Sequence, residues 1–161
     1  MRRMCSFVLA LILMLGLISC TQSTEARWQE QYDLGVRYLS EGNYEEAIIA
    51  FTVAIEIDPK QAPAYVGRGD AYIGTGETEE NLNSALEDYL KATELEPDDA
   101  DTYAKAAEVY ILLGQIDEAR SLLEQGFANT NSDILKSMLE SLLLNEFGST
   151  IFSRATWLSA I

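Results

Sequence analysis

Residues 34–59 read LGVRYLSEGNYEEAIIAFTVAIEIDP, and this stretch decides the fold because its pattern returns twice further along the chain. The pattern holds a small residue with a tyrosine three positions on, a second glycine, and an alanine followed four positions later by a large apolar residue. The first small residue is glycine in two copies and alanine in the weaker third copy. The copies are Gly35, Tyr38, Gly42, Ala47, Phe51, Ala54 and Pro59; Gly69, Tyr72, Gly76, Ala85, Tyr89, Ala92 and Pro97; and Ala107, Tyr110, Gly114, Ala119, Leu123 and Gly126. A unit that recurs in this way predicts a stack of similar helix pairs.

Small residues mark the places where the two helices of a pair would cross closely. Gly35, Gly69 and Ala107 would lie at the crossing on the first helix, and Ala47, Ala85 and Ala119 would meet them from the second. Gly42, Gly76 and Gly114 fall between the helices, where a C-terminal left-handed position favours glycine. Pro59 and Pro97 would end the second helices of the first two pairs.

These residues resemble the tetratricopeptide repeat, a helix–turn–helix unit of about 34 residues. The resemblance implies an all-α protein, an α-α superhelix of three repeats over about 28–61, 62–99 and 100–133. Expected helices run over about 27–40, 44–57, 63–73, 81–95, 100–113 and 116–128. Residues 134–147 form the predicted C-terminal capping helix, with a broad apolar face that would pack on the last repeat.

The N-terminus has the pattern of a secretory signal. Arg2 and Arg3 are followed by the apolar stretch 7–18, which is shorter than the roughly 20 residues that a membrane span needs. The ending Leu17-Ile18-Ser19-Cys20 resembles a bacterial lipobox. That resemblance implies a lipoprotein signal peptide over 1–19, a lipid on Cys20, a spacer over 20–27, and a protein held on the extracytoplasmic side of a bacterial membrane. An ordinary signal peptide or an uncleaved anchor would also fit these residues.

Composition excludes several classes of function. Formal charge is −15, from 11 Lys and Arg against 26 Asp and Glu, which disfavours nucleic acid as a partner. The absence of histidine removes the commonest general base and metal ligand, and no glycine-rich phosphate loop is present. The acidic run from Glu94 to Asp101 lacks the glycine and the spacing of a calcium loop. We therefore expect no enzyme activity, no cofactor and no metal.

The family resemblance implies a concave groove lined by the first helix of each repeat. The positions carried over are Gln29, Tyr32, Val36 and Leu39; Pro63, Val66, Asp70 and Ile73; and Asp101, Ala104, Glu108 and Leu112. From these we predict a partner-binding set of Tyr32, Val36, Val66, Asp70, Asp101, Ala104 and Glu108, apolar towards the first repeat and acidic towards the third. Its partner would be a protein or peptide with apolar and basic residues.

One subclass of the family grips a chaperone's terminal carboxylate with a clamp of Lys, Asn and Arg side chains. At those positions this chain has Tyr32, Val36, Gly67, Asp101 and Lys105, of which only Lys105 is basic. The resemblance therefore does not imply a chaperone partner.

Two segments depart from the repeat. Repeat two has four extra residues between Gly76 and Ser84, which would enlarge a turn. The tail 148–161 is apolar and has no repeat pattern; it could pack on the capping helix, dock on a partner or begin a truncated repeat. The function predicted from the sequence is a membrane-anchored adaptor that binds protein or peptide. Alternatives are a lipoprotein that binds a small ligand or is an enzyme, and a self-assembling structural module.

Overall fold

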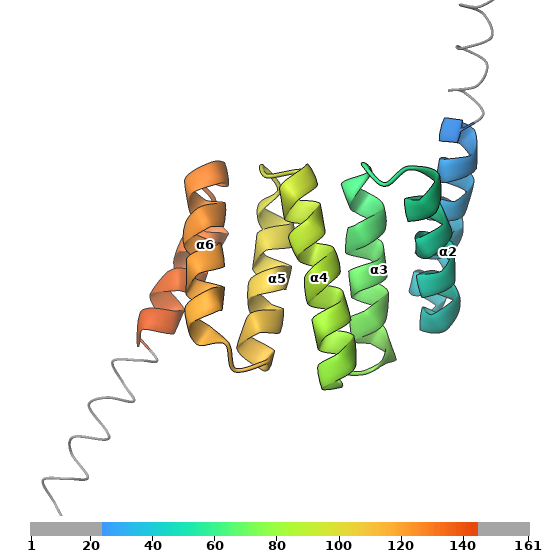
Figure 1. Ribbon diagram of the computed structural model, residues 1–161. Coiled ribbons are helices and arrows are strands. Elements are labelled where there is room, and N and C mark those ends of the chain that lie inside the picture. Colours follow the sequence, from blue (N-terminus) through green and yellow to red (C-terminus); the bar gives the residue numbers. More distant parts are fainter. Residues whose placement is uncertain (1–23, 145–161) are drawn as a thin grey trace, which may run out of the picture.

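The computed structural model describes residues 24–144, and within that range the chain forms helices joined by short turns (Figure 1). A first helix covers residues 24–41 and a last helix covers 133–144. Between them lie α2 (Tyr44–Ile57), α3 (Ala62–Thr75), α4 (Glu79–Leu95), α5 (Ala100–Leu112) and α6 (Ile116–Thr130). From α2 to α6 each helix packs against the next one along the chain. The predicted all-α solenoid of helix–turn–helix repeats is confirmed.

Glycine lets the aromatic side chains of the second helices reach the first helices. A Cβ added to Gly35 would lie 2.7 Å from Cε1 of Phe51, and one added to Gly67 would lie 2.4 Å from Cζ of the same ring. At Gly69 the Cβ would lie 2.6 Å from Cε1 of Tyr89. The atoms nearest to each of these glycines therefore belong to the rings, a close packing that the prediction of small residues at the crossing did not include. The ring four positions after each alanine fills the space that the missing side chain leaves.

The insertion in repeat two lengthens a helix more than it lengthens a turn. α4 begins at Glu79, two residues before the expected start, and has 17 residues where α2 has 14. The Thr78 side chain caps it by accepting a hydrogen bond from the Asn81 backbone N–H at 3.2 Å. The Asn81 amide in turn donates to the Thr75 hydroxyl and the Gly76 carbonyl, both at 2.9 Å. These bonds complete the helix start, so most of the extra residues become helical.

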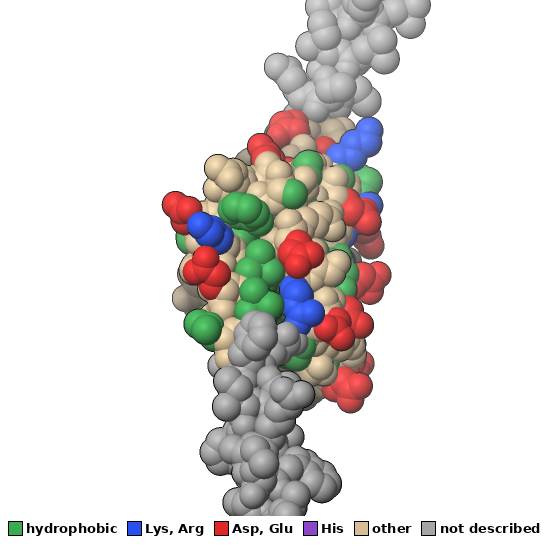
Figure 2. All heavy atoms as spheres, turned by 90° about the vertical axis from the view of Figure 1, so that its left-hand side faces the viewer, with side chains coloured by type: hydrophobic (Ala, Val, Ile, Leu, Met, Phe, Trp, Pro, Cys, Tyr) green, Lys and Arg blue, Asp and Glu red, His purple; other side chains and the backbone are tan. Residues whose placement is uncertain are grey.

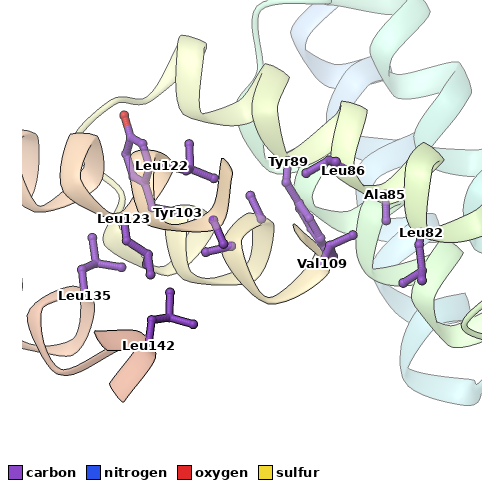
Figure 3. Close-up of a cluster of buried hydrophobic side chains, with 13 residues drawn as sticks. Leu82, Ala85, Leu86, Tyr89, Tyr103, Val109, Leu122, Leu123, Leu135 and Leu142 are labelled. Carbon is purple, nitrogen blue, oxygen red and sulfur yellow. The ribbon is translucent and has the colours of Figure 1, made fainter. Parts of the chain in front are cut away.

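The largest buried cluster joins α4, α5, α6 and the last helix (Figure 3). Leu135 and Leu142 of the last helix are buried there beside Leu123 and Tyr103. Other apolar residues of the last helix, Ile134, Leu143 and Leu144, are exposed, so the predicted broad apolar face is only partly covered. The first helix begins by residue 24, inside the segment predicted as a spacer, and positions 145–147 of the predicted capping helix lie outside the described residues. No helix between residues 24 and 144 is long and apolar enough to cross a membrane.

Candidate functional site

Two hollows lie along the first helices of the repeats, and we call them together the concave groove. The N-terminal hollow measures about 250 Å³. Its lining comes from the first helix, α3 and the turn before α5, with Phe51 of α2 at its base: Tyr32, Val36, Leu39, Phe51, Pro63, Val66, Gly67, Asp70, Glu96 and Asp99. Tyr32 and Val36 are four residues apart on the first helix, so their side chains lie on the same face of that helix and both reach the hollow.

The C-terminal hollow measures about 300 Å³ and lies between α3 and α5. It is lined by Asp70, Ile73, Glu77, Tyr89, Lys105, Glu108, Val109 and Leu112. Because Asp70 lines both hollows, the two are neighbouring parts of one surface. Apolar side chains line each hollow, and acidic groups lie among them.

Most of the predicted partner-binding residues line this surface. Tyr32, Val36 and Val66 line the N-terminal hollow, Glu108 lines the C-terminal hollow, and Asp70 lines both. Asp101 and Ala104 line neither hollow; the first is exposed and the second is half-buried on α5. Sequence reasoning missed Glu77, Glu96 and Asp99, because they lie in turns or at helix ends that the groove positions of the repeat do not include.

Asp70 is tied into the protein and is not the free charge that the sequence suggested. Its carboxylate accepts two hydrogen bonds from Lys105 Nζ, at 2.9 and 3.0 Å, and one from the Tyr89 hydroxyl at 2.7 Å. Burial and the hydrogen bond to Asp70 raise the pKa of the Tyr89 phenol, so it stays a donor. Lys105 also lies 3.7 Å from Asp101. Two carboxylates therefore offset the charge of Lys105, and Glu108 keeps an exposed negative charge beside them.

The last helix extends the same surface. A Cβ on Gly126 of α6 would lie 2.9 Å from Leu135, whereas Ala54, the matching residue of α2, clusters with Ala64 of α3. Leu135 thus takes the place of Ala64. Counting on from there, Ile134 and Leu144 take the places of Pro63 and Ile73, which line the groove. Ser137 and Ser141 take the places of Val66 and Asp70, so the corresponding face of the last helix carries an apolar residue at each end and serines between them.

A second charged pair lies away from the groove and holds three helices together. Arg68 of α3 donates two hydrogen bonds to Asp88 of α4, at 2.7 and 2.8 Å, and a third to Thr52 of α2 at 3.1 Å. Burial raises the pKa of the Asp88 carboxyl, while the hydrogen bond from Arg68 opposes that rise. All the acceptor groups here are used within the protein, so we assign the pair a structural role.

The charged side chains of the described residues form no cluster that could hold a metal ion: between residues 24 and 144 no three His, Cys, Asp or Glu side chains are grouped in that way. Two acidic groups of the groove are bonded within the protein: Asp70 as described above, and Asp99, which accepts from the Thr102 hydroxyl and from the Asp101 backbone N–H. What the surface presents to a partner is apolar area and negative charge.

Comparison with known proteins identifies the repeats. Residues 35–76 match a family model described as TPR repeat, and residues 78–142 match one described as tetratricopeptide repeat. The chain therefore carries tetratricopeptide repeats along its helical part, which confirms the family resemblance of the sequence. A search of curated proteins found no match to the sequence.

Solved structures of the same fold align with most of the chain. The first TPR domain of Spaghetti (RPAP3), bound to the HSP90 peptide SRMEEVD, is 20% identical with a TM-score of 0.64, over 74% of this chain and 93% of that one. The second TPR domain of human RPAP3, in complex with the HSP70 peptide SGPTIEEVD, is 22% identical with a TM-score of 0.64, over 74% and 97%. A TPR protein of Thermus thermophilus is 25% identical with a TM-score of 0.58, over 72% of this chain and 63% of that one. These likenesses show the fold.

Proposed function

We propose that this tetratricopeptide-repeat protein is a lipid-anchored adaptor of the bacterial cell envelope. Its concave groove binds an extended or helical segment of a partner protein, with apolar side chains at the ends of the groove and Lys or Arg at the acidic centre. The observation that carries the proposal is the neutralised Lys105 next to the exposed Glu108. The groove has one cation among its lining residues, and that cation is already paired with Asp70.

Two of the similar structures support the use of the groove for peptides. Both hold chaperone peptides that end in EEVD, which are acidic at their ends. In this chain the positions of the carboxylate-binding clamp carry Tyr32, Val36, Gly67 and Asp101 as well as Lys105. We therefore propose the same place of binding with the opposite charge preference. Electrostatic complementarity of this kind sets specificity and association rate more than affinity.

The anchor would keep the groove close to the membrane surface. Cys20 lies outside the described residues, and the lipid on it remains a prediction from the lipobox Leu17-Ile18-Ser19-Cys20. From Cys20 to residue 24, where the first helix is already formed, four residues span at most about 14 Å. One acyl chain holds a protein on a membrane only weakly, whereas two or more hold it stably, and the diacylglycerol of a lipoprotein supplies two.

Cys20→Ser should abolish the incorporation of labelled fatty acid and leave the precursor at its full length. The reason is that the thiol of Cys20 is the proposed acceptor of the lipid. Metabolic labelling with a fatty-acid analogue, followed by gel mobility, measures both effects. Cys5→Ser is the matched control, because that residue lies within the predicted signal peptide and should change neither. Continued labelling of Cys20→Ser would show that the lipoprotein assignment is wrong.

Selection from a random peptide library tests the groove's preference. Peptides retained by the full chain should combine apolar residues with Lys or Arg, and their retention should fall in high salt, where the Debye length shrinks to roughly 3 Å at 1 M. A soluble EEVD peptide should not compete with them. Selection of acidic peptides, or competition by the EEVD peptide, would contradict the proposed charge preference.

A further inference from the structure

We propose that residues 149–161 bind in the groove of their own chain, over the last helix and into the C-terminal hollow. This occupant would have to leave before a partner segment could bind there. Only the competition with a partner rests on the proposed function. The intramolecular contact itself is argued from the exposed apolar surface and from the sequence of the tail.

Exposed apolar side chains lie at both ends of the last helix and at the end of α5. Ile134 is 66% exposed and Leu144 is 72% exposed, and both take the places of groove-lining residues of α3. Leu112 of the C-terminal hollow is 53% exposed. Figure 2 looks at the C-terminal end of the solenoid and shows hydrophobic side chains in a band across it, with both acidic and basic groups beside them. Apolar surface of this kind next to charged groups is typical of a binding site.

The last helix is not built to receive the second helix of a fourth repeat. Counting from Leu135 as the equivalent of Ala64, Glu140 stands where α3 has Gly69, and Lys136 stands where α3 has Tyr65. Both Glu140 and Lys136 are exposed. A helix could not press an aromatic ring against this position as α4 presses Tyr89 against Gly69. The side chains of the last helix therefore disfavour packing of the tail as part of a fourth repeat.

The tail has the chemistry that the groove is proposed to select. Residues 148–161 contain five large apolar side chains and a single charged one, the cation Arg154. The apolar residues are Ile151, Phe152, Trp157, Leu158 and Ile161. Segments with this many apolar residues seldom stay fully solvated. Arg154 would complement Glu108, the exposed acid of the C-terminal hollow.

The distance is short enough for the tail to reach. Tyr103 of α5 and Leu135 of the last helix both pack on Gly126, at 2.6 and 2.9 Å from the position of its Cβ. The two helices are therefore close neighbours, and such helix axes lie roughly 8–10 Å apart. Thirteen residues from Leu144 to Trp157 can span up to about 45 Å when extended. Even with a reversal of direction near Gly148, Trp157 can lie beside Leu112.

Self-occupation would lower the apparent affinity of the groove for any partner. A ligand that binds only the open form has its dissociation constant raised by the inverse of the open fraction. The tail would thus act as a competitor held at high effective concentration by its short connection. An arriving partner would need to match the groove better than the tail does.

Fluorescence of Trp157 tests the contact in the full chain. Of the two tryptophans, Trp28 is replaced by phenylalanine so that Trp157 alone reports. Trp157 should be shielded from acrylamide, and Leu112→Asp in the same background should remove the shielding. Ile49→Asp is the matched control, since Ile49 is also exposed but lies on α2, outside both hollows. Full quenching of Trp157 before any groove substitution would overturn the proposal, as would equal effects of the two aspartates.

Two further readings separate this contact from other outcomes. Shielding should not depend on protein concentration; dependence would mean that a second copy supplies the contact, and the intramolecular proposal would be wrong. Trp157→Ser should tighten the binding of a selected basic, apolar peptide by about threefold or more if the tail fills most grooves. Shielding of Trp157, together with no peptide binding even by Trp157→Ser, would refute the proposed function alone. Peptide binding with a fully quenched Trp157 would refute the tail contact alone.

Discussion

Arg68→Met should lower the free energy of unfolding by about 3–5 kcal/mol, the largest single loss that we expect in this protein. Its guanidinium makes two hydrogen bonds to Asp88 and one to Thr52, and so connects α2, α3 and α4. Asp88 is only 3% exposed. Without Arg68 its carboxylate would remain buried with no cation to compensate for lost hydration, and that penalty, more than the lost attraction, sets the size of the effect.

The loss should also depend on pH. Removing Arg68 takes away the hydrogen bond and the charge that oppose the effect of burial, so the pKa of Asp88 should rise further above its ordinary value. A carboxyl with a raised pKa in the folded state stabilises the fold below the unfolded pKa of about 3.9, and this contribution is lost as pH rises through the folded pKa. The difference between parent and variant should therefore narrow in acid.

Urea denaturation of Arg68→Met beside the double variant Arg68→Met/Asp88→Leu measures the effect. The double variant carries no buried charge and should regain most of the stability. A single variant as stable as the parent would show that the pair contributes little. A double variant as unstable as the single one would show that the loss comes from packing of the arginine side chain and not from the unpaired carboxylate.

Gly67→Leu should lower the free energy of unfolding by about 1–3 kcal/mol or more, because the larger side chain overpacks the place where two helices cross. Phe51 is fully buried, and its ring lies between Gly35 of the first helix and Gly67 of α3. A Cβ at Gly67 would already lie 2.4 Å from Cζ of the ring. On its other side the ring already packs directly against Gly35 of the first helix. The ring therefore cannot move away from a new side chain at position 67 without shifting that helix.

Gly74→Leu in the same helix is the matched control. A Cβ there would lie 2.3 Å from Tyr44, but that tyrosine is only half-buried and can turn towards solvent. In urea denaturation, Gly74→Leu should lower the free energy of unfolding clearly less than Gly67→Leu does. Equal losses at the two positions would show that the ring of Phe51 is not confined in the way the packing suggests.

The fold could be predicted from the sequence because the residues that determine each helix pair lie within a single repeat. Glycines at a fixed distance from an aromatic residue, a glycine in the turn and a proline after the second helix all lie within about 34 residues, and each acts locally. The expected helix ends were accurate to within about three residues, and the largest surprise in the local structure was at the start of α4. There the sequence suggested a longer turn, but a Thr78 cap and the side-chain bonds of Asn81 complete an earlier helix start.

The charges of the groove could not be predicted in the same way. Asp70 and Lys105 lie 35 residues apart, and only the packing of α3 and α5 on α4 brings them within 2.9 Å. Their pairing turns one expected acidic contact into an internal one. The position of the last helix in the groove was also not predicted from the sequence. Leu135 follows Gly126 by nine positions, whereas the equivalent residue Ala64 follows Ala54 by ten. One residue fewer rotates that helix by about 100°, so Ile134 and Leu144 take the places of groove residues.

Affinity for a selected basic, apolar peptide tests the acidic groove most directly, with Glu77→Lys/Glu108→Lys, two exposed acids that line the C-terminal hollow, compared to the parent chain. Asp70 is left intact because it holds Lys105 and Tyr89. Glu56→Lys/Glu124→Lys is the control, since it makes the same charge change at exposed positions of α2 and α6, away from both hollows. We expect the groove variant to bind about tenfold or more weakly, mainly through slower association. Equal affinity of the parent, groove and control chains would contradict binding at the groove.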